Sequence, residues 1–220
     1  MKTHTKEFFD NLTPYAAYDV LREGNKRFVN NLKINRNLLQ QLNETASQQY
    51  PFAVVLSCMD SRTSVELIFD QGIGDIFSIR IAGNVVNDDV LGSMEYACKV
   101  VGSKLIVVMG HTRCGAIKGA CEKVQMGNLT GLLDKIKPAI EKTTPKYKDL
   151  CTSEHVEEVS KVNVTHGLEE ILERSSIIRT LYEEGKIGLV GAMYSVETGM
   201  VNFTRYLFNE DMSAHQRIAV

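Results

Sequence analysis

Two cysteines and a histidine lie where apolar, β-branched segments of the sequence end. Cys58 closes the run 52–58, and His111 with Cys114 follows the run 104–110. If both runs are parallel strands, their carboxyl ends meet at one edge of the sheet, where open α/β sheets bind ligands. Two thiolates and one imidazole suit a tetrahedral Zn²⁺, and three protein ligands leave the fourth position for water, as in catalytic zinc sites. Because a lone cysteine at a strand end is more often a core residue, we interpret Cys98, Cys121 and Cys151 as structural.

A carboxylate and a guanidinium follow the first of these cysteines at intervals of two residues, in Asp60 and Arg62. Arginine can bind a carboxylate through two parallel hydrogen bonds, which would keep Asp60 ionised and fix the direction of its oxygens. Zinc lowers the pKa of a bound water from about 15.7 to about 7, and an oriented carboxylate can accept a hydrogen bond from the hydroxide so formed. Asp60 and Arg62 are therefore candidate catalytic residues, with a purely structural ion pair as the alternative.

The elements that must position these residues follow a β-α-β-α-β pattern, which predicts an α/β fold. We expect a mostly parallel central sheet of four strands plus a C-terminal antiparallel strand, flanked by helices, with an N-terminal helical arm. Thr13 and Pro14 read as the N-cap and first residue of an amphipathic helix that runs through Phe28, followed by a polar connector over 33–50. Strands are predicted at 52–58, 75–81, 104–110, 187–193 and 201–206, and helical patterns at 65–70, 90–101, 119–125, 132–141 and 154–184.

Composition indicates one domain over residues 1–220 and excludes some partners. The chain has 220 residues, 44% of them hydrophobic, and a formal net charge of −2 from 25 basic and 27 acidic residues without long like-charge blocks. This charge pattern gives no electrostatic footprint for nucleic acid. No apolar run is long enough to span a bilayer, and the N-terminus does not look like a signal peptide. Five cysteines, an odd number, favour reduced thiols, so we expect a cytoplasmic protein without a membrane partner.

Two segments around the candidate ligands resemble paired motifs of the β-class carbonic anhydrases. They are Cys58-Met59-Asp60-Ser61-Arg62 and Gly110-His111-Thr112-Arg113-Cys114-Gly115-Ala116. Residues 21–28, 80–84 and 91–97 are also similar to family patterns, so the resemblance covers nearly the whole chain. It implies the reversible hydration of CO2 to bicarbonate and a proton by a zinc-bound hydroxide. The family's zinc ligands match Cys58, His111 and Cys114, and its catalytic dyad matches Asp60 and Arg62.

The resemblance also assigns a substrate cleft and an assembly. Apolar walls suit CO2, and the backbone N–H of Gly115 would lie near the bicarbonate anion. Members of the family are dimers or larger, which implies a homodimer or a dimer-of-dimers tetramer in which residues 1–32 contact the partner. We expect the apolar face of residues 15–28 to be exposed for that contact. The remaining cleft positions match Gln49, Phe77, Ala82 and Tyr96.

Regulation and two other functions stay open at this point. In one type of the family a Trp-Arg-Tyr set binds bicarbonate and draws the aspartate onto zinc, closing the site. Arg80 and Tyr194 match two members of that set, but Val55 occupies the tryptophan position, so we predict the open type, with Asp60 a fourth ligand only in a closed state. The same chemistry could instead hydrolyse carbonyl sulfide or carbon disulfide. Alternatively, the chain could be a structural or redox zinc protein without turnover.

Overall fold

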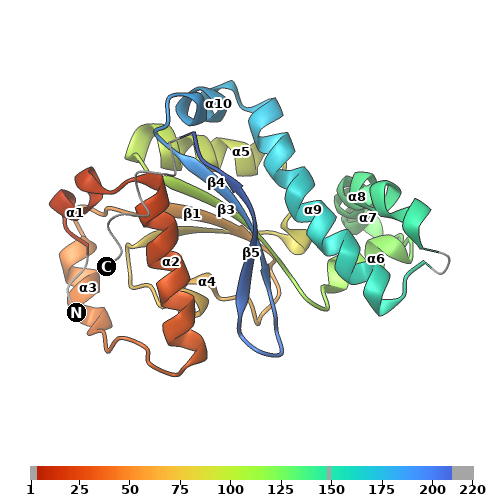
Figure 1. Cartoon of the computed structure of the whole chain (residues 1–220), viewed down its shortest axis with the longest axis horizontal. Coiled ribbons are helices and arrows are strands. Elements are labelled where there is room, and N and C mark those ends of the chain that lie inside the picture. The colour runs from red at the N-terminus through yellow and green to blue at the C-terminus, as the bar shows by residue number, and fades with distance from the viewer. Residues whose placement is uncertain (1–3, 148–149, 210–220) are drawn as a thin grey trace.

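The computed structural model describes residues 4–147 and 150–209, and its centre is a single sheet. The strands lie in the order β2-β1-β3-β4-β5 (Figure 1). The first four pair in parallel, and β5 runs antiparallel to β4, so the predicted sheet is confirmed. The strands are β1 (Ala53–Ser57), β2 (Ile76–Arg80), β3 (Leu105–His111), β4 (Gly188–Tyr194) and β5 (Val201–Leu207).

Helices cover both faces of the sheet because successive strand side chains point to opposite sides. One face, which includes Val55 and Val107, packs against α1 (Lys6–Asn11), α2 (Pro14–Val29) and α4 (Val65–Ile68). The other face, which includes Val54 and Val108, packs against α5 (Asp88–Glu95), the π-helix Tyr96–Val101, α9 (Ser153–Arg174) and α10 (Ser176–Glu183).

A third apolar cluster lies beyond the carboxyl ends of the strands, at the right of Figure 1. It is built from α6 (Gly115–Cys121), α7 (Gly127–Leu133), the 3₁₀ turn 134–136, α8 (Lys137–Thr143) and the first turns of α9. Two other short 3₁₀ turns lie at 82–84 and 144–146. Cys58 and Cys114 belong to this cluster. The predicted ligand edge of the sheet is therefore covered by helices.

Several predicted helix boundaries are corrected. The pattern over 154–184 is interrupted at Ser175, which ends α9 and whose side-chain oxygen accepts a hydrogen bond from the N–H of Ile178 to begin α10. The polar connector 33–50 contains α3 (Leu38–Thr45), capped by Asn37. Its leucines are exposed and Gln41 is buried, so its burial is the reverse of what periodicity suggests.

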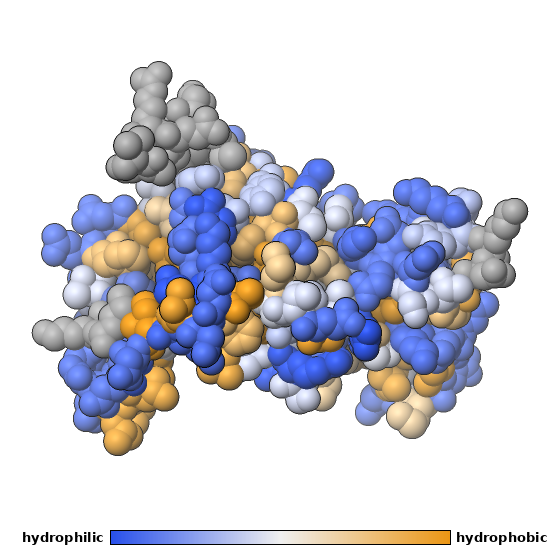
Figure 2. Space-filling model, turned by 60° about the horizontal axis from the view of Figure 1, so that its bottom comes forward, coloured by the Kyte–Doolittle hydropathy of each residue, from blue (hydrophilic) through white to orange (hydrophobic). Residues whose placement is uncertain are grey.

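In Figure 2 hydrophobic surface is visible at the end that carries α1–α3 and at the end that carries α6–α8.

The N-terminal helix α2 begins where predicted, with Thr13 accepting a hydrogen bond from the N–H of Ala16 and Pro14 in the first turn. The expectation that its apolar face is exposed is wrong. Ala17 and Leu21 are fully buried against this chain's own sheet. Asn25 fixes the helix further by donating to the carbonyls of Ile68 and Gly199. Any contact of residues 1–32 with a partner must therefore use the outer surface of the arm.

Within the described residues no helix is long and apolar enough to cross a membrane.

Candidate metal centre

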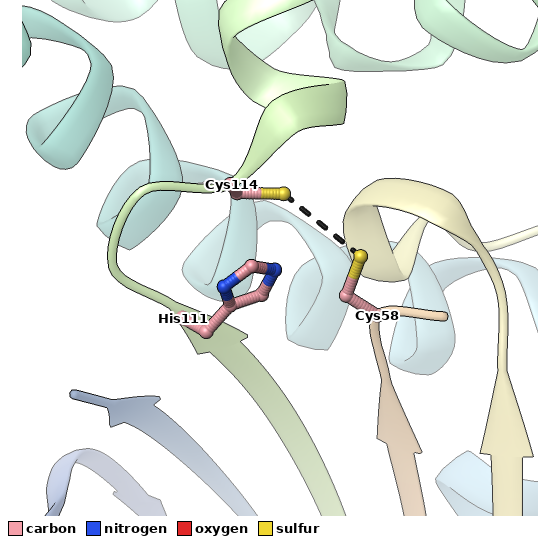
Figure 3. Close-up of side chains that lie close together, drawn as sticks. All are labelled: Cys58, His111 and Cys114. Carbon is pink, nitrogen blue, oxygen red and sulfur yellow. Dashed lines mark hydrogen bonds between the residues drawn. The ribbon is translucent and has the colours of Figure 1, made fainter. Parts of the chain in front are cut away.

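The structure brings the three predicted metal ligands together at the carboxyl edge of the sheet. Cys58 follows β1, His111 is the last residue of β3, and Cys114 precedes α6. Their ligand atoms lie within 4.8 Å of one another, all three residues are buried, and the two sulfurs are 3.9 Å apart (Figure 3). Among the described residues no other group of three or more His, Cys, Asp or Glu residues has this arrangement.

The donor set fits a divalent cation. The Nδ1 of His111 lies 2.9 Å from the carbonyl oxygen of Thr112, so Nδ1–H is the donor and Nε2 carries the lone pair. That Nε2 is buried and has no hydrogen-bond partner in the described part of the chain. The hydrogen bond from Cys114, with the backbone N–H groups of Asp60 and Gly83, lowers the pKa of Cys58, while the pKa of Cys114 is raised by the same pairing. A metal would displace the remaining proton.

The loop between His111 and Cys114 is fixed by contacts with two other elements. Thr112 donates its N–H to the carbonyl of Tyr194 at 2.9 Å, and its hydroxyl accepts from the N–H of Val196 at 3.1 Å. Arg113 turns the chain with a φ of 55°, and its N–H donates to Glu157 at 3.1 Å. The spacing of the histidine and the second cysteine is thus held by β4, the turn after it and α9.

The loop after Cys58 is held by its backbone carbonyls. The buried hydroxyl of Thr63 donates to the carbonyls of Cys58 at 2.7 Å and Asp60 at 2.8 Å. The guanidinium of Arg80 donates to the carbonyls of Met59 at 3.1 Å and Asp60 at 2.6 Å. Sequence reasoning missed Thr63, although a threonine three residues after an aspartate in a loop is a signal for such a turn. The sequence placed Arg80 in a family segment and in a regulatory set, and gave no sign that it holds the Cys58 loop.

Asp60 and Arg62 form the predicted bidentate pair beside the cluster. The Nε of Arg62 donates to Oδ1 at 2.9 Å, its Nη2 to Oδ2 at 2.7 Å, and its backbone N–H to Oδ1 at 2.9 Å. These hydrogen bonds hold the pKa of the Asp60 carboxyl well below its usual range. Asp60 is therefore ionised, and its oxygens have a fixed direction.

A cavity of about 500 Å³ opens beside Cys58 and Asp60. Ala82 and Gly115, two of the predicted substrate residues, line it. Its other walls are mainly apolar, with one cation on α6 and one carboxylate at the C-cap of that helix. These residues are Met59, Ala116, Lys118, Gly119, Glu122, Val124, Leu129 and Leu133.

The other three predicted substrate residues do not lie at this cavity within the chain. Phe77 pairs with Val54, and Cys58 lies four residues further along the strand direction, about 13 Å away at 3.3 Å per residue. Tyr96 is beside Phe77, with ring centroids 6.4 Å apart, and the two line a separate cavity of about 630 Å³. Gln49 lies near Gly74, before β2 begins, at the amino end of the strands. Their place in the cleft stays a prediction.

Fold and site together define an α/β protein with a buried Cys2His cluster at the carboxyl edge of its sheet. The family profile described as carbonic anhydrase matches residues 53–201. A protein named carbonic anhydrase 2 from Mycobacterium tuberculosis is 36% identical over 194 residues, covering 86% of this chain and 92% of the relative. A carbonic anhydrase of Mycolicibacterium smegmatis is 33% identical over 200 residues, covering 90% and 96%.

Solved structures are similar over most of the chain. The β-carbonic anhydrase CafA of Aspergillus fumigatus superposes with a TM-score of 0.70 at 26% identity, covering 80% of this chain and 85% of that one. A tetrameric β-carbonic anhydrase of Sordaria macrospora has a TM-score of 0.68 at 25% identity, covering 74% and 84%. The chain belongs to the carbonic anhydrase family, in its β class, and is an enzyme of that family.

Proposed function

We propose that this enzyme hydrates CO2 reversibly to bicarbonate and a proton at a zinc ion held by Cys58, His111 and Cys114. The observation that supports this most strongly is the convergence of the three ligand atoms beside an oriented carboxylate at the mouth of a cavity. Two thiolates with an imidazole are a donor set that zinc favours. A purely structural zinc site more often has four protein ligands, and the described residues supply three here.

Zinc, when bound, supplies a Lewis acid that brings the pKa of a water into the neutral range. The protein's own part is to orient, to exclude water and to bind the product. Asp60 presents carboxylate oxygens, fixed by Arg62, as hydrogen-bond acceptors on the open side of the cluster. The apolar walls near Ala82 suit a nonpolar substrate. Gly115, whose N–H could bind an anionic product, lines the same cavity, as does Lys118, whose ammonium lies 3.7 Å from the carboxylate of Glu122.

We assign the site to the open type. Arg62 holds both oxygens of Asp60 in a bidentate pair, so Asp60 would have to give up part of this pair to bind the metal as a fourth ligand. Val55, which stands where a tryptophan would complete the regulatory set, is fully buried in β1. Arg80 is already engaged with backbone carbonyls of the Cys58 loop. A crystal structure of the zinc enzyme at neutral pH that placed an Asp60 oxygen on the metal would contradict this assignment.

We also propose that the enzyme is a cytoplasmic homodimer or a dimer of dimers. The five cysteines are free thiols in the structure, which suits a reducing compartment. Three of the predicted cleft residues lie away from this chain's own cluster, on or near the edge strand β2, where a second copy can reach them.

The reaction is tested by stopped-flow CO2 hydration with a pH indicator on zinc-loaded enzyme. We expect wild-type turnover and a loss of about 10²-fold in kcat/KM for Asp60→Asn, because the amide cannot accept hydrogen bonds with both of its terminal atoms. His111→Ala should lose the zinc as well as the activity. Asp10→Asn, on the exposed surface of α1, is the matched control and should keep both.

Two outcomes separate this proposal from its rivals. Full zinc occupancy without CO2 hydration, but with release of sulfide from carbonyl sulfide or carbon disulfide, would assign the site to the sulfur analogues. Full occupancy without any turnover, and equal inactivity of Asp60→Asn and wild type, would indicate a structural or redox site. Failure of wild type to hold one zinc per chain would refute the metal assignment itself.

A further inference from the structure

Helix α9 lies against both segments that carry the candidate ligands, although it comes much later in the sequence. It approaches β3 closely at Gly110, where a Cβ would lie 2.9 Å from Val164 and 2.8 Å from the sulfur of Met193. A side chain at this position, immediately before His111, would force Val164 or Met193 to move. The side of α9 that faces the cluster carries Glu157, Ser160 and Asn163 at intervals of three residues, which places them on one face of a helix.

The sulfur of Cys58 accepts a hydrogen bond from a backbone N–H outside its own loop. Gly83 donates to this sulfur at 3.4 Å. Gly83 has a φ of 67°, a conformation that favours glycine, and a Cβ there would also press against the end of the Ile136 side chain at 2.9 Å. The turn is closed on one side by the N–H of Asn84, which donates to the carbonyl of Ile81 at 2.9 Å.

The other side of this turn is held by Asn163. Its side-chain Nδ2 donates to the carbonyl of Gly83 at 2.9 Å, and the asparagine is only 4% exposed. The bond joins residues 80 positions apart and lies in the buried layer between α9 and the cluster. Asn163 therefore fixes the peptide that follows Gly83, and with it the orientation of the glycine whose N–H points at Cys58.

We propose that Asn163 is a positioning residue for the metal centre: through Gly83 it maintains the N–H···S hydrogen bond to Cys58. This inference rests on the proposed zinc site. An N–H donor at a ligating sulfur withdraws electron density from it and fixes its direction, and contacts of this kind tune metal affinity. Two thiolates donate more charge to a metal than imidazoles do, so a donor at one sulfur offsets part of that effect. Asn163 is not among the residues that line the cavity, so we give it no direct part in the chemistry.

The test measures zinc retention and the electronic spectrum of the site, not activity alone. Zinc-loaded wild type, Asn163→Ala and Asn163→Asp are mixed with a chromophoric chelator, and the rate of zinc transfer is followed. The same proteins are loaded with Co²⁺ to record the thiolate-to-metal charge-transfer band. Asn163→Asp keeps the size of the side chain but replaces the donor by an oxygen that faces the carbonyl of Gly83. Ser160→Ala is the matched control, because its buried hydroxyl has no hydrogen-bond partner in the described structure.

We expect both Asn163 variants to transfer zinc about 10- to 100-fold faster than wild type and to shift the charge-transfer band, with Ser160→Ala unchanged. The free energy of unfolding of the zinc-free proteins is measured alongside. If Asn163→Ala does not fold, the isosteric Asn163→Asp carries the test. Transfer rates and band positions equal to wild type in a folded Asn163 variant would overturn the inference. If wild type itself retained no zinc, that result would refute the proposed zinc site, and with it the inference about Asn163 that rests on this site. A failure of the inference alone would show as normal zinc retention in wild type and in the Asn163 variants alike.

Discussion

Asp60 is held by three hydrogen bonds from a single residue, and this arrangement depends on the shape of arginine. The guanidinium of Arg62 meets both carboxylate oxygens, while the backbone N–H of Arg62 meets one of them. Lysine carries the same charge on a single nitrogen and cannot reproduce the two parallel bonds. The pair is partly exposed, with the side chain of Arg62 about half accessible to solvent. It therefore contributes little to the free energy of folding, and its main effect is to orient the carboxylate of Asp60.

We therefore predict that Arg62→Lys lowers kcat/KM for CO2 hydration by at least about 10-fold, because loss of orientation costs rate without loss of charge. Zinc content and thermal stability should stay at wild-type values. Stopped-flow hydration with parallel metal analysis measures both. Arg22→Lys, on the outer surface of α2, is the control for an arginine in an exposed ion pair. Wild-type activity in Arg62→Lys would show that only the positive charge matters.

At the scale of the elements, a buried ion cluster joins α2 to the turn after α4. Asp70 is 2% exposed at its side chain, and Arg27 donates to it at 2.6 Å. Arg36 pairs with its other oxygen, and the N–H of Ile34 donates at 3.2 Å. The pKa of Asp70 is lowered, because these hydrogen bonds outweigh the effect of burial, which is the largest single contribution and acts in the opposite direction.

We predict that Asp70→Asn reduces the free energy of unfolding at pH 7 by about 3 kcal/mol, because two guanidinium groups lose a buried partner. A carboxyl whose folded pKa is depressed stabilises above its unfolded pKa of about 3.9. That contribution is lost as the pH falls through the folded value. The difference in the free energy of unfolding between wild type and variant should therefore be largest near pH 7 and become smaller below about pH 4. Urea unfolding of the zinc-free proteins measures it, with Asp10→Asn as control. If this difference stayed the same in acid, the stabilisation by Asp70 would not come from its negative charge.

The three central strands, β1, β3 and β4, were predictable because burial on both faces leaves a continuous apolar run, and the edge strands β2 and β5 were predictable from their β-branched and aromatic residues. All five predicted strands appear, and the junction of Thr13 and Pro14 marks the start of α2 as expected. Helix boundaries were less predictable. Glycines at 115 and 119 obscure α6, which begins at Gly115 and not near 119, and the exposed leucines of α3 reverse the usual pattern. Gln41 is buried there because its side-chain oxygen accepts from the N–H of Ile73, a tertiary contact without a local signal.

The residues of the site likewise divide into those with a local sequence signal and those placed only by tertiary contacts. The ligands and the Asp60–Arg62 pair were predictable, because each combination of residue types lies in a short segment at a strand end. Glu157 and Asn163 were not, because they come from α9 and reach the cluster only through tertiary packing. An isolated glutamate or asparagine within a helical pattern carries no mark of what its side chain contacts.

On the scale of the whole molecule, one chain does not assemble the entire predicted cleft. Phe77 and Tyr96 lie at the edge strand β2, and Tyr96 is 56% exposed. An edge strand presents unpaired backbone groups to a partner, and a two-fold axis beside it would bring each copy's Phe77 and Tyr96 toward the other copy's metal centre. In the proposed dimer, a second chain would then complete the cavity at Cys58, and the active site would depend on dimer formation.

Subunit complementation tests this arrangement. Cys58→Ala, which loses the metal, and the double variant Phe77→Ala/Tyr96→Ala, which loses the cleft side chains, are coexpressed with different tags, and the heterodimer is isolated. If the cleft residues come from the partner, the zinc-bearing protomer regains an intact cleft, and the heterodimer should reach about half of wild-type turnover, because one of its two sites is complete. The parental homodimers, measured under the same conditions, should both be strongly impaired. Activity of the heterodimer no higher than the mean of those homodimers would place Phe77 and Tyr96 outside a shared site.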